Sequence, residues 1–390
     1  MVMAEWWWLI GACVGHAVGQ VYCMNQWFGG NWDHHLQKVL RFSHGLVILA
    51  GWWVFADYFR SLFSEGASPA TAGLWGQVVW GYGLFCCTLA FGALPADLLG
   101  RWRRRSRALL HNHTRTVDVA AELGYKPVGH GRRAWAARLP GNNIFQVDFT
   151  EKALYLPRLP AAWDGLSILH LTDLHFHGVP SRDFFRVVLD VCRDWDPDLV
   201  ALTGDFVDSP WHHRWILPLL GRLRWRVAAF AVIGNHDTWF DPRLVRRRLA
   251  RLNIDALGNH WRLIEVRGEP LVVIGHEGPW VEPAPDLRGC PDGVFQLCLS
   301  HTPDNIPWAR HHGIDLMLAG HNHGGQIRLP VVGPVFVPSR YGRRYDGGVY
   351  DEGPTVLHVC RGLSGRDPLR YNCRPEVTKI ILRAGEAPRD

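Results

Sequence analysis

The stretch Asp198-Leu199-Val200-Ala201-Leu202-Thr203-Gly204-Asp205 is an apolar run that ends in a glycine and a carboxylate. Continuous apolar character of this length is typical of a strand that is covered on both faces of a sheet. Gly204 permits a sharp exit from the strand, which leaves Asp205 at the sheet edge. An aspartate in this position is more often a turn former than a catalytic group, so its interpretation depends on whether the pattern recurs.

The pattern does recur, because four further predicted strands end in polar residues of the same kinds. These strands span residues 166–171, 228–233, 294–299 and 314–319. They run into Asp173-Leu174-His175, Asn235-His236-Asp237, Ser300-His301 and His321-Asn322-His323 respectively. Open α/β sheets place their sites at the carboxyl ends of strands, so we expect these side chains to converge.

Helices alternate with the strands and predict an α/β fold. Ser181 is a suitable N-cap for one helix, residues 215–223 form another, and Asp241-Pro242 begins a third. We expect two short strands at 144–147 and 153–156. The segments 356–359 and 377–381 are expected to be strands of a second sheet, so the whole is a layered sandwich.

Composition excludes several classes of function. A length of 390 residues favours two modules. The net charge of +6 is concentrated in the cluster Arg101, Arg103, Arg104, Arg105 and Arg107, which indicates a local electrostatic partner rather than nucleic acid. The nine cysteines show no C-x-x-C spacing, which disfavours a thiolate zinc site and a disulfide framework and fits a reducing compartment.

The first hundred residues predict membrane-spanning helices. No charged residue occurs in 6–32 or in 66–96, and both runs exceed the roughly 20 residues that cross a bilayer. The run 42–56 is shorter and could cross only with its ends snorkelling, so two or three spans are expected. Ten of the twenty tryptophans lie in the first 102 residues, which favours interfacial anchoring over the alternative of a soluble helical domain.

These features divide the chain into a membrane region at 1–100, a basic linker at 101–142 and a catalytic module at 143–390. The first run lacks the basic start of a cleaved signal peptide, so we expect it to remain in the mature protein. The positive-inside rule places the arginine cluster, and with it the rest of the chain, on the cytosolic side of a cell membrane that the chain crosses several times. Lys38 and Arg41 share that side if there are three spans.

Five blocks, DLH, GDFVD, GNHD, SH and GHNHGGQ, occur in this order and resemble the signature blocks of the calcineurin-like metallophosphoesterases. The resemblance covers roughly residue 143 to the C-terminus, and all five blocks are intact. Together with the N-terminal region, the GGQ extension is most similar to the membrane-associated bacterial phosphodiesterase branch. The resemblance implies an α/β/β/α sandwich of two mixed sheets, preceded by an α-helical membrane region.

The resemblance also implies a site for two divalent metal ions, with manganese, iron or zinc compatible with nitrogen and oxygen donors. One ion would be held by Asp173, His175, Asp205 and His323, and the other by Asp205, Asn235, His301 and His321. The expected reaction is direct attack on phosphorus by a water that the metals acidify. His236 is the expected general acid, Asp237 would orient it, and Asp208 would brace the ligand loops.

Several alternatives stay open at this point. Asp208 and Asp237 could instead serve only as capping or turn residues, and His177 is expected to be a surface loop residue rather than a further ligand. The substrate is expected to be a phosphodiester or pyrophosphate on a small molecule or a lipid. UDP-2,3-diacylglucosamine hydrolysis in lipid A synthesis is one alternative. A binding-only membrane receptor with a phosphoesterase fold is another, which the complete ligand set disfavours.

Overall fold

The computed structural model describes residues 2–32, 34–64, 73–131 and 133–385. The chain divides into two compact units. A helical unit contains the residues up to Arg104 together with 340–344, and a catalytic unit contains 105–339 and the chain from Tyr345 onward.

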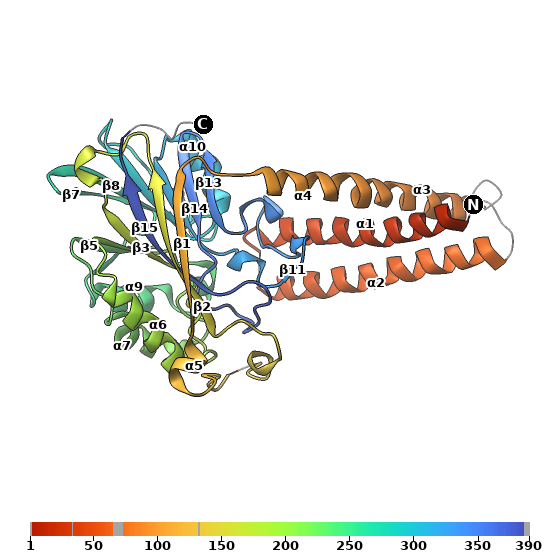
Figure 1. The fold of residues 1–390 in the computed structure, drawn as a ribbon, viewed down its shortest axis with the longest axis horizontal. Coiled ribbons are helices and arrows are strands. Elements are labelled where there is room, and N and C mark those ends of the chain that lie inside the picture. The colour runs from red at the N-terminus through yellow and green to blue at the C-terminus, as the bar shows by residue number, and fades with distance from the viewer. Residues whose placement is uncertain (1, 33, 65–72, 132, 386–390) are drawn as a thin grey trace. The chain divides into compact units, whose positions relative to one another are not determined.

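The helical unit is built from long helices, drawn in red to orange in Figure 1. Its helices are α1 Val2–Phe28, α2 His34–Ser64, α3 Leu74–Thr88 and α4 Leu94–Arg103. A π-helical turn, Leu89–Ala93, joins α3 to α4. Small residues let α1 approach α3 closely, because a Cβ on Gly15 would lie 1.7 Å from the carbonyl oxygen of Cys86.

Two stretches of this unit are long and apolar enough to cross a membrane by length and composition, at His35–Leu62 and Leu74–Arg103. The middle run, which looked too short, lies within the 31-residue helix α2 because that helix continues past Asp57 and Arg60. The run 66–96 lies partly outside the described residues. The first run forms most of α1, but α1 is not among the two candidate spans. It carries polar groups such as His16, whose ring contacts Tyr82 Oη at 2.8 Å.

The catalytic unit contains a seven-stranded mixed sheet in the order β1-β2-β15-β3-β4-β5-β6. The strands from β3 to β6 are parallel, and β15 is antiparallel to β3. Their bounds are β1 Leu109–Asp118, β2 Gln146–Tyr155, β15 Glu376–Arg383, β3 Ser167–Leu171, β4 Leu199–Leu202, β5 Ala228–Ala231 and β6 Ile254–Ala256.

A second, six-stranded mixed sheet has the order β13-β14-β10-β9-β8-β7. Its strands are β13 Gly348–Glu352, β14 Thr355–Val359, β10 Leu316–Ala319, β9 Phe295–Ser300, β8 Glu269–His276 and β7 Trp261–Val266. A small hairpin pairs β11 Arg328–Leu329 with β12 Gly333–Pro334.

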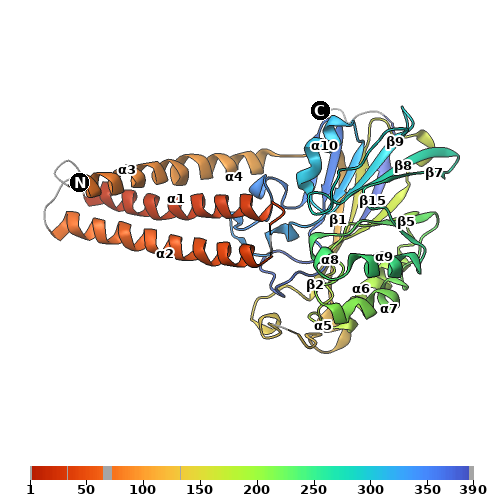
Figure 2. The same ribbon diagram turned by 180° about the vertical axis from the view of Figure 1, so that it is seen from behind.

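Helices cover the outer faces of the two stacked sheets, as Figures 1 and 2 show. On the first sheet these are α6 Arg182–Asp194, α7 Ile216–Leu220 and α9 Pro242–Ala250, and on the second α10 Ile306–His311. Two further short helices are α5 Val119–Leu123 and α8 Asn235–Trp239. The order of layers is therefore α/β/β/α, as the family resemblance implies.

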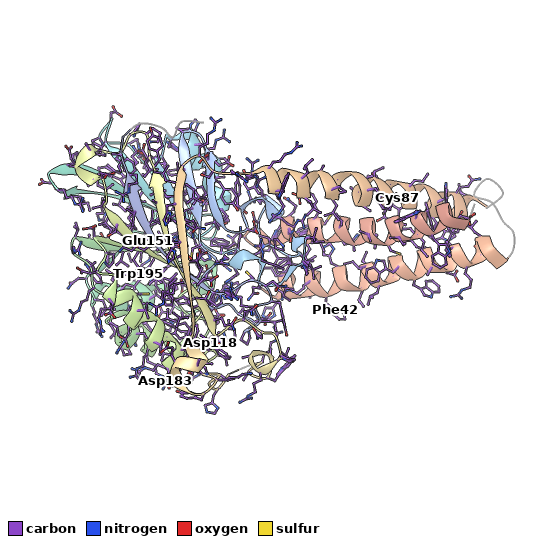
Figure 3. The ribbon with its side chains drawn as sticks, viewed as in Figure 1. Phe42, Cys87, Asp118, Glu151, Asp183 and Trp195 are labelled. Carbon is purple, nitrogen blue, oxygen red and sulfur yellow. The ribbon has the colours of Figure 1, made fainter. Side chains whose placement is uncertain are left out.

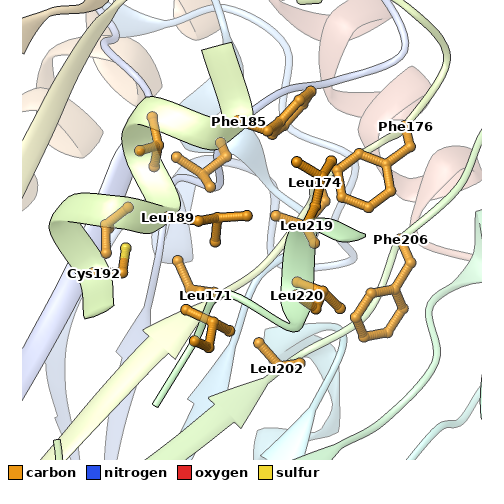
Figure 4. Packing of buried hydrophobic residues seen from close by; sticks show 14 of the residues in the cluster. Leu171, Leu174, Phe176, Phe185, Leu189, Cys192, Leu202, Phe206, Leu219 and Leu220 are labelled. Atoms are coloured by element: carbon orange, nitrogen blue, oxygen red, sulfur yellow. The ribbon is translucent and has the colours of Figure 1, made fainter. Parts of the chain in front are cut away.

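Apolar packing holds these layers together. Helix α6 buries Phe185, Leu189 and Cys192 against the strands β3 and β4 (Figure 4). Between the sheets, Ile168 of β3 and Leu297 of β9 belong to one buried cluster. Burial of this extent is the main favourable term in folding and fixes the strand ends relative to one another.

Three expectations about elements are wrong. One strand, β2, joins most of the segments 144–147 and 153–156, because the residues between them pair continuously with β1 and β15 and the polar Asp148, Thr150 and Lys152 are buried. The strand at 377–381, β15, lies in the first sheet. The expected linker contains β1 and α5, and the carboxylate of Asp118 (Figure 3) caps α5 by accepting from the N–H groups of Ala120 and Ala121.

A buried network of charges ties β2 to β15. Lys152 Nζ lies 2.6 Å from Glu376 Oε1, and Arg361 Nε lies 3.0 Å from Glu376 Oε2. Burial alone would raise the pKa of Glu376, but Arg361 and Lys152 hold it well below its usual range. Glu376 is therefore ionised in the folded protein and neutralises buried cations.

We predict that Glu376→Gln lowers the stability of the catalytic unit by about 3–5 kcal/mol, because it leaves the buried Lys152 ammonium without its ion-pair partner. Glu151→Gln is the control, since Glu151 on the neighbouring strand β2 (Figure 3) is 40% exposed and 3.6 Å from Lys379 Nζ, and its loss costs at most about 1 kcal/mol. Thermal unfolding measures both. The effect is fully present above about pH 4.3 and diminishes as pH falls through the lower pKa of folded Glu376. Equal midpoints for the two variants would contradict the network.

Candidate metal centre

The predicted ligands lie at the carboxyl ends of strands from both sheets. Loops after β3, β4 and β5 of the first sheet and after β9 and β10 of the second carry them. Five of the predicted ligands have a positive φ, which is uncommon for residues other than glycine. They are Asp173, His175, Asp205, His321 and His323. Such strained backbone persists where the surrounding structure imposes it, and it clusters at functional sites.

One group of ligand atoms gathers around Asp173. His175 Nε2 lies 3.6 Å from Asp173 Oδ1 and 3.4 Å from Asp205 Oδ2. His323 Nε2 lies 3.6 Å from the same oxygen of Asp173. The side chains of Asp173, His175 and His323 thus offer a set of atoms that could hold one cation.

A second group of ligand atoms adjoins the first, and Asp205 Oδ2 is close to both groups. His301 Nε2 lies 3.3 Å from Asp205 Oδ2 and 3.1 Å from Asn235 Oδ1. His321 Nδ1 lies 3.2 Å from His301 Nε2. Because Asp205 Oδ2 is close to both His175 and His301, Asp205 occupies the position between the two groups.

The residues fit a pair of divalent cations. Among the described residues, Asp173 Oδ1, Asp205 Oδ2, His175 Nε2 and His321 Nε2 are buried without a hydrogen-bond partner. Leaving so many polar atoms unsatisfied is costly, and a bound cation would satisfy them. Ligand atoms about 2.0–2.2 Å from one cation are separated by about 3 Å, which agrees with the observed spacing.

The glycines that precede the ligands make room for these carboxylates. A Cβ on Gly234 would lie 2.1 Å from Asp205 Oδ1, and a Cβ on Gly320 would lie 2.5 Å from Asp173 Oδ2. Any larger residue at either position would displace the carboxylate beside it. The glycines of the GNHD and GHNHGGQ blocks are therefore needed for space as well as for turning.

The electrostatics of the site favour cations. Burial alone would raise the pKa of Asp205, but His301, His236 and His175 hold it below its usual range. Burial alone would lower the pKa of His301, but Asp205 and Asp173 raise it to about 9. Without a metal, a proton on His301 compensates the carboxylates, and a divalent cation would take over this role.

Asp208 connects one metal-ligand histidine to the expected general acid. Its Oδ1 accepts a hydrogen bond from His175 Nδ1 at 2.8 Å and another from His236 Nδ1 at 2.6 Å. A carboxylate only accepts, so both rings carry their proton on Nδ1 and leave Nε2 available. Burial alone would raise the pKa of Asp208, but His175 and His236 hold it well below its usual range.

Asp237 makes a different set of contacts. Its carboxylate accepts from the backbone N–H groups of Asp205 at 2.9 Å, Phe206 at 2.9 Å and Val207 at 3.1 Å. The contacts are thus the reverse of the expectation, since Asp208 holds His236 and Asp237 braces the loop of Asp205. The reason is geometric: His236 and Asp237 are consecutive on α8, and consecutive helical side chains do not face each other.

Two tryptophans near the metal groups were missed by the sequence analysis. The ring of Trp280 lies 4.9 Å from that of His321, and the ring of Trp239 lies 4.4 Å from that of His236. Trp239 follows His236 by three residues on α8, and helical spacing could have identified it. Trp280 is in a loop after β8 that carries no motif, so no sequence signal indicated it.

His177, the extra histidine, stays apart from both ligand groups. Its Nε2 contacts the carbonyl oxygen of Gly365 at 3.1 Å. The ring is partly buried rather than fully on the surface. Its contact with a loop carbonyl is consistent with a structural role.

The predicted metal ligands lie in a part of the chain that resembles known proteins. The family model of the calcineurin-like phosphoesterases matches residues 166–325. Phosphodiesterase YaeI of Escherichia coli is 31% identical over 55% of this chain and 81% of its own length. A transmembrane protein with a metallophosphoesterase domain from Bos taurus is 28% identical over 58% of this chain and 55% of its own. UDP-2,3-diacylglucosamine pyrophosphatase LpxG of Chlamydia trachomatis is 24% identical over 62% and 90%. The chain therefore belongs to the calcineurin-like metallophosphoesterase family.

Proposed function

We propose that the metal centre hydrolyses a phosphodiester or pyrophosphate bond at a membrane surface. Membership of the family makes the chain a phosphoesterase. The observation that carries the finer proposal is the pair of ligand groups sharing Asp205, with His236 held beside them by Asp208. This arrangement suits attack on phosphorus with assisted departure of the leaving oxygen.

The predicted ligands form two sets, one for each cation. Asp173, His175, Asp205 and His323 would hold one divalent cation, and Asp205, Asn235, His301 and His321 the other. When bound, the two cations lower the pKa of a water and neutralise charge on the phosphoryl oxygens. Mixed nitrogen and oxygen ligands suit manganese, iron or zinc.

His236 supplies the proton for the leaving group in this proposal. Its Nδ1 donates to Asp208, so Nε2 is the atom that carries a transferable proton when the ring is cationic. Nε2 lies 4.0 Å from Asp205 Oδ2, which places it at the edge of the ligand groups rather than within them. The carboxylate of Asp208 accepts from Nδ1 and thereby fixes the orientation of the ring.

We predict that His236→Ala slows hydrolysis of an alkyl phosphodiester by about 10²–10⁴-fold, the usual contribution of a general acid. A p-nitrophenyl diester should be affected much less, because its leaving oxygen needs no proton. Asp208→Asn should show the same selectivity in weaker form. Steady-state kinetics on both esters measures the ratio, with His260→Ala, an exposed histidine, as the control. Equal losses on both esters would contradict the general-acid role.

A lipid-linked substrate in a membrane agrees with several features. Two helical stretches of this chain are long and apolar enough to span a bilayer. The relative from Bos taurus is named a transmembrane protein. The cluster at Arg101–Arg107 would attract anionic headgroups, and the positive-inside rule would then place the catalytic unit in the cytosol of a multi-pass protein. LpxG acts by its name on a diacylated nucleotide sugar, and it supports UDP-2,3-diacylglucosamine as the second candidate.

Full-length protein with manganese should hydrolyse phosphodiesters or pyrophosphates, among them lipid-linked ones, faster than monoesters. Asp205→Asn should lower kcat by roughly a thousandfold or more, because both cations lose their shared ligand. Asp292→Asn, which changes an exposed carboxylate, is the control and should leave kcat unchanged. Wild-type turnover in a folded Asp205→Asn protein would refute the two-metal site. Efficient hydrolysis of soluble nucleotides with none of lipid-linked phosphates would refute the lipid substrate.

A further inference from the structure

The hairpin of β11 and β12 exposes a cluster of apolar side chains. We name residues 329–332, Leu-Pro-Val-Val, the apolar tip. Val331 is 93% exposed and Leu329 is 48% exposed, and Ile327 just before the hairpin is 38% exposed. Single exposed apolar residues are common on soluble proteins, but a contiguous group of them marks an interaction surface.

The base of this hairpin is held firmly beside the metal centre. The hairpin begins five residues after the ligand His323. Arg328 Nη1 donates to the carbonyl oxygen of Gly324 at 3.2 Å and to Asp346 Oδ2 at 2.6 Å. The root of the hairpin is therefore fixed to the GHNHGGQ loop, while Leu329, Pro330 and Val331 of the tip are exposed.

A basic and aromatic segment adjoins the hairpin through an intermediate loop. Asn372 Nδ2 donates to the carbonyl oxygen of Arg328 at 3.0 Å, and Tyr371 Oη donates to that of Pro140 at 3.1 Å. In the segment 131–140, Arg133 and Arg138 are exposed, and Arg133 is ion-paired with Asp367. Trp135 of the same segment is 63% exposed. Exposed tryptophan, arginine and aliphatic side chains together are typical of surfaces that bind the interface of an anionic bilayer.

Chain connectivity favours a bilayer over a protein partner. Five residues separate the end of the candidate span Leu74–Arg103 from the start of β1 at Leu109. Those five residues, 104–108, extend to at most about 18 Å. A membrane that holds this helix is therefore always within reach of the catalytic unit.

We propose that the apolar tip inserts into the interface of a lipid bilayer and so holds the ligand loops of the metal centre at the membrane surface. The inference rests on the membrane association proposed above and does not depend on the identity of the substrate. A phosphate group that lies at the level of the lipid headgroups could then reach the ligand loops without leaving the bilayer.

Photocrosslinking of the full chain in lipid nanodiscs tests this inference. The discs contain phosphatidylcholine and phosphatidylglycerol, and the substitution is Val331→p-benzoylphenylalanine. The same substitution at Leu49, 60% exposed on α2, reports the candidate span, and at Leu263, 52% exposed on β7, it is the control outside the proposed surface. We expect the probes at Val331 and Leu49 to label lipid acyl chains and the probe at Leu263 not to.

The outcomes separate this inference from the proposal on which it rests. Labelling of lipid from Leu49 but not from Val331, or attachment of Val331 to protein, overturns the role of the tip and leaves membrane association intact. Absence of lipid labelling at both positions overturns both. A second experiment measures hydrolysis rates. Val331→Asp should slow hydrolysis of a vesicle-borne phosphodiester about tenfold and leave the rate on a soluble diester unchanged. Val331→Leu should leave both rates unchanged. Equal rates for the Asp and Leu variants on vesicles would also contradict the inference.

Discussion

The carboxylate of Asp205 lies between two groups of buried ligand atoms, and the surrounding structure serves to keep it there. Its Oδ2 is within 3.4 Å of His175 Nε2 and within 3.3 Å of His301 Nε2. Buried carboxylates and unsatisfied imidazole nitrogens are expensive for a folded protein. Two divalent cations would offset this cost, so the unsatisfied buried atoms make the site suitable for binding metals.

Backbone bracing and shared acceptors hold this charged centre in place. The carboxylate of Asp237 accepts hydrogen bonds from the N–H groups of Asp205, Phe206 and Val207, and thereby fixes the loop that carries Asp205. Asp208 contacts a ligand histidine and the proposed general acid with one oxygen, so it couples the position of the metal to that of the proton donor. The stacked sheets supply the rigid frame, because the ligands come from strands of both.

Much of this arrangement could be predicted from the sequence, and the reasons are local. Apolar runs of four to six residues ending in Asp or His gave the buried strands and the residues that the structure brings together. The roles of Asp208 and Asp237 could not be predicted, because neighbours in sequence need not be neighbours in space. The sequence predicts a linker where β1 lies, because most residues of β1 are exposed and show no apolar alternation. The position of β15 in the first sheet depends on long-range pairing with β2 and on the buried Lys152–Glu376 ion pair, which no local pattern reports.

The account depends most on two cations sharing Asp205, and anomalous diffraction tests this directly. Crystals of the protein grown with manganese should give two anomalous peaks about 3.5–4 Å apart, the usual separation in two-metal sites. Each peak should lie within bonding distance of an Asp205 oxygen, one beside His175 and His323 and the other beside His301 and His321. A single peak, or two peaks of which only one contacts Asp205, would contradict the account.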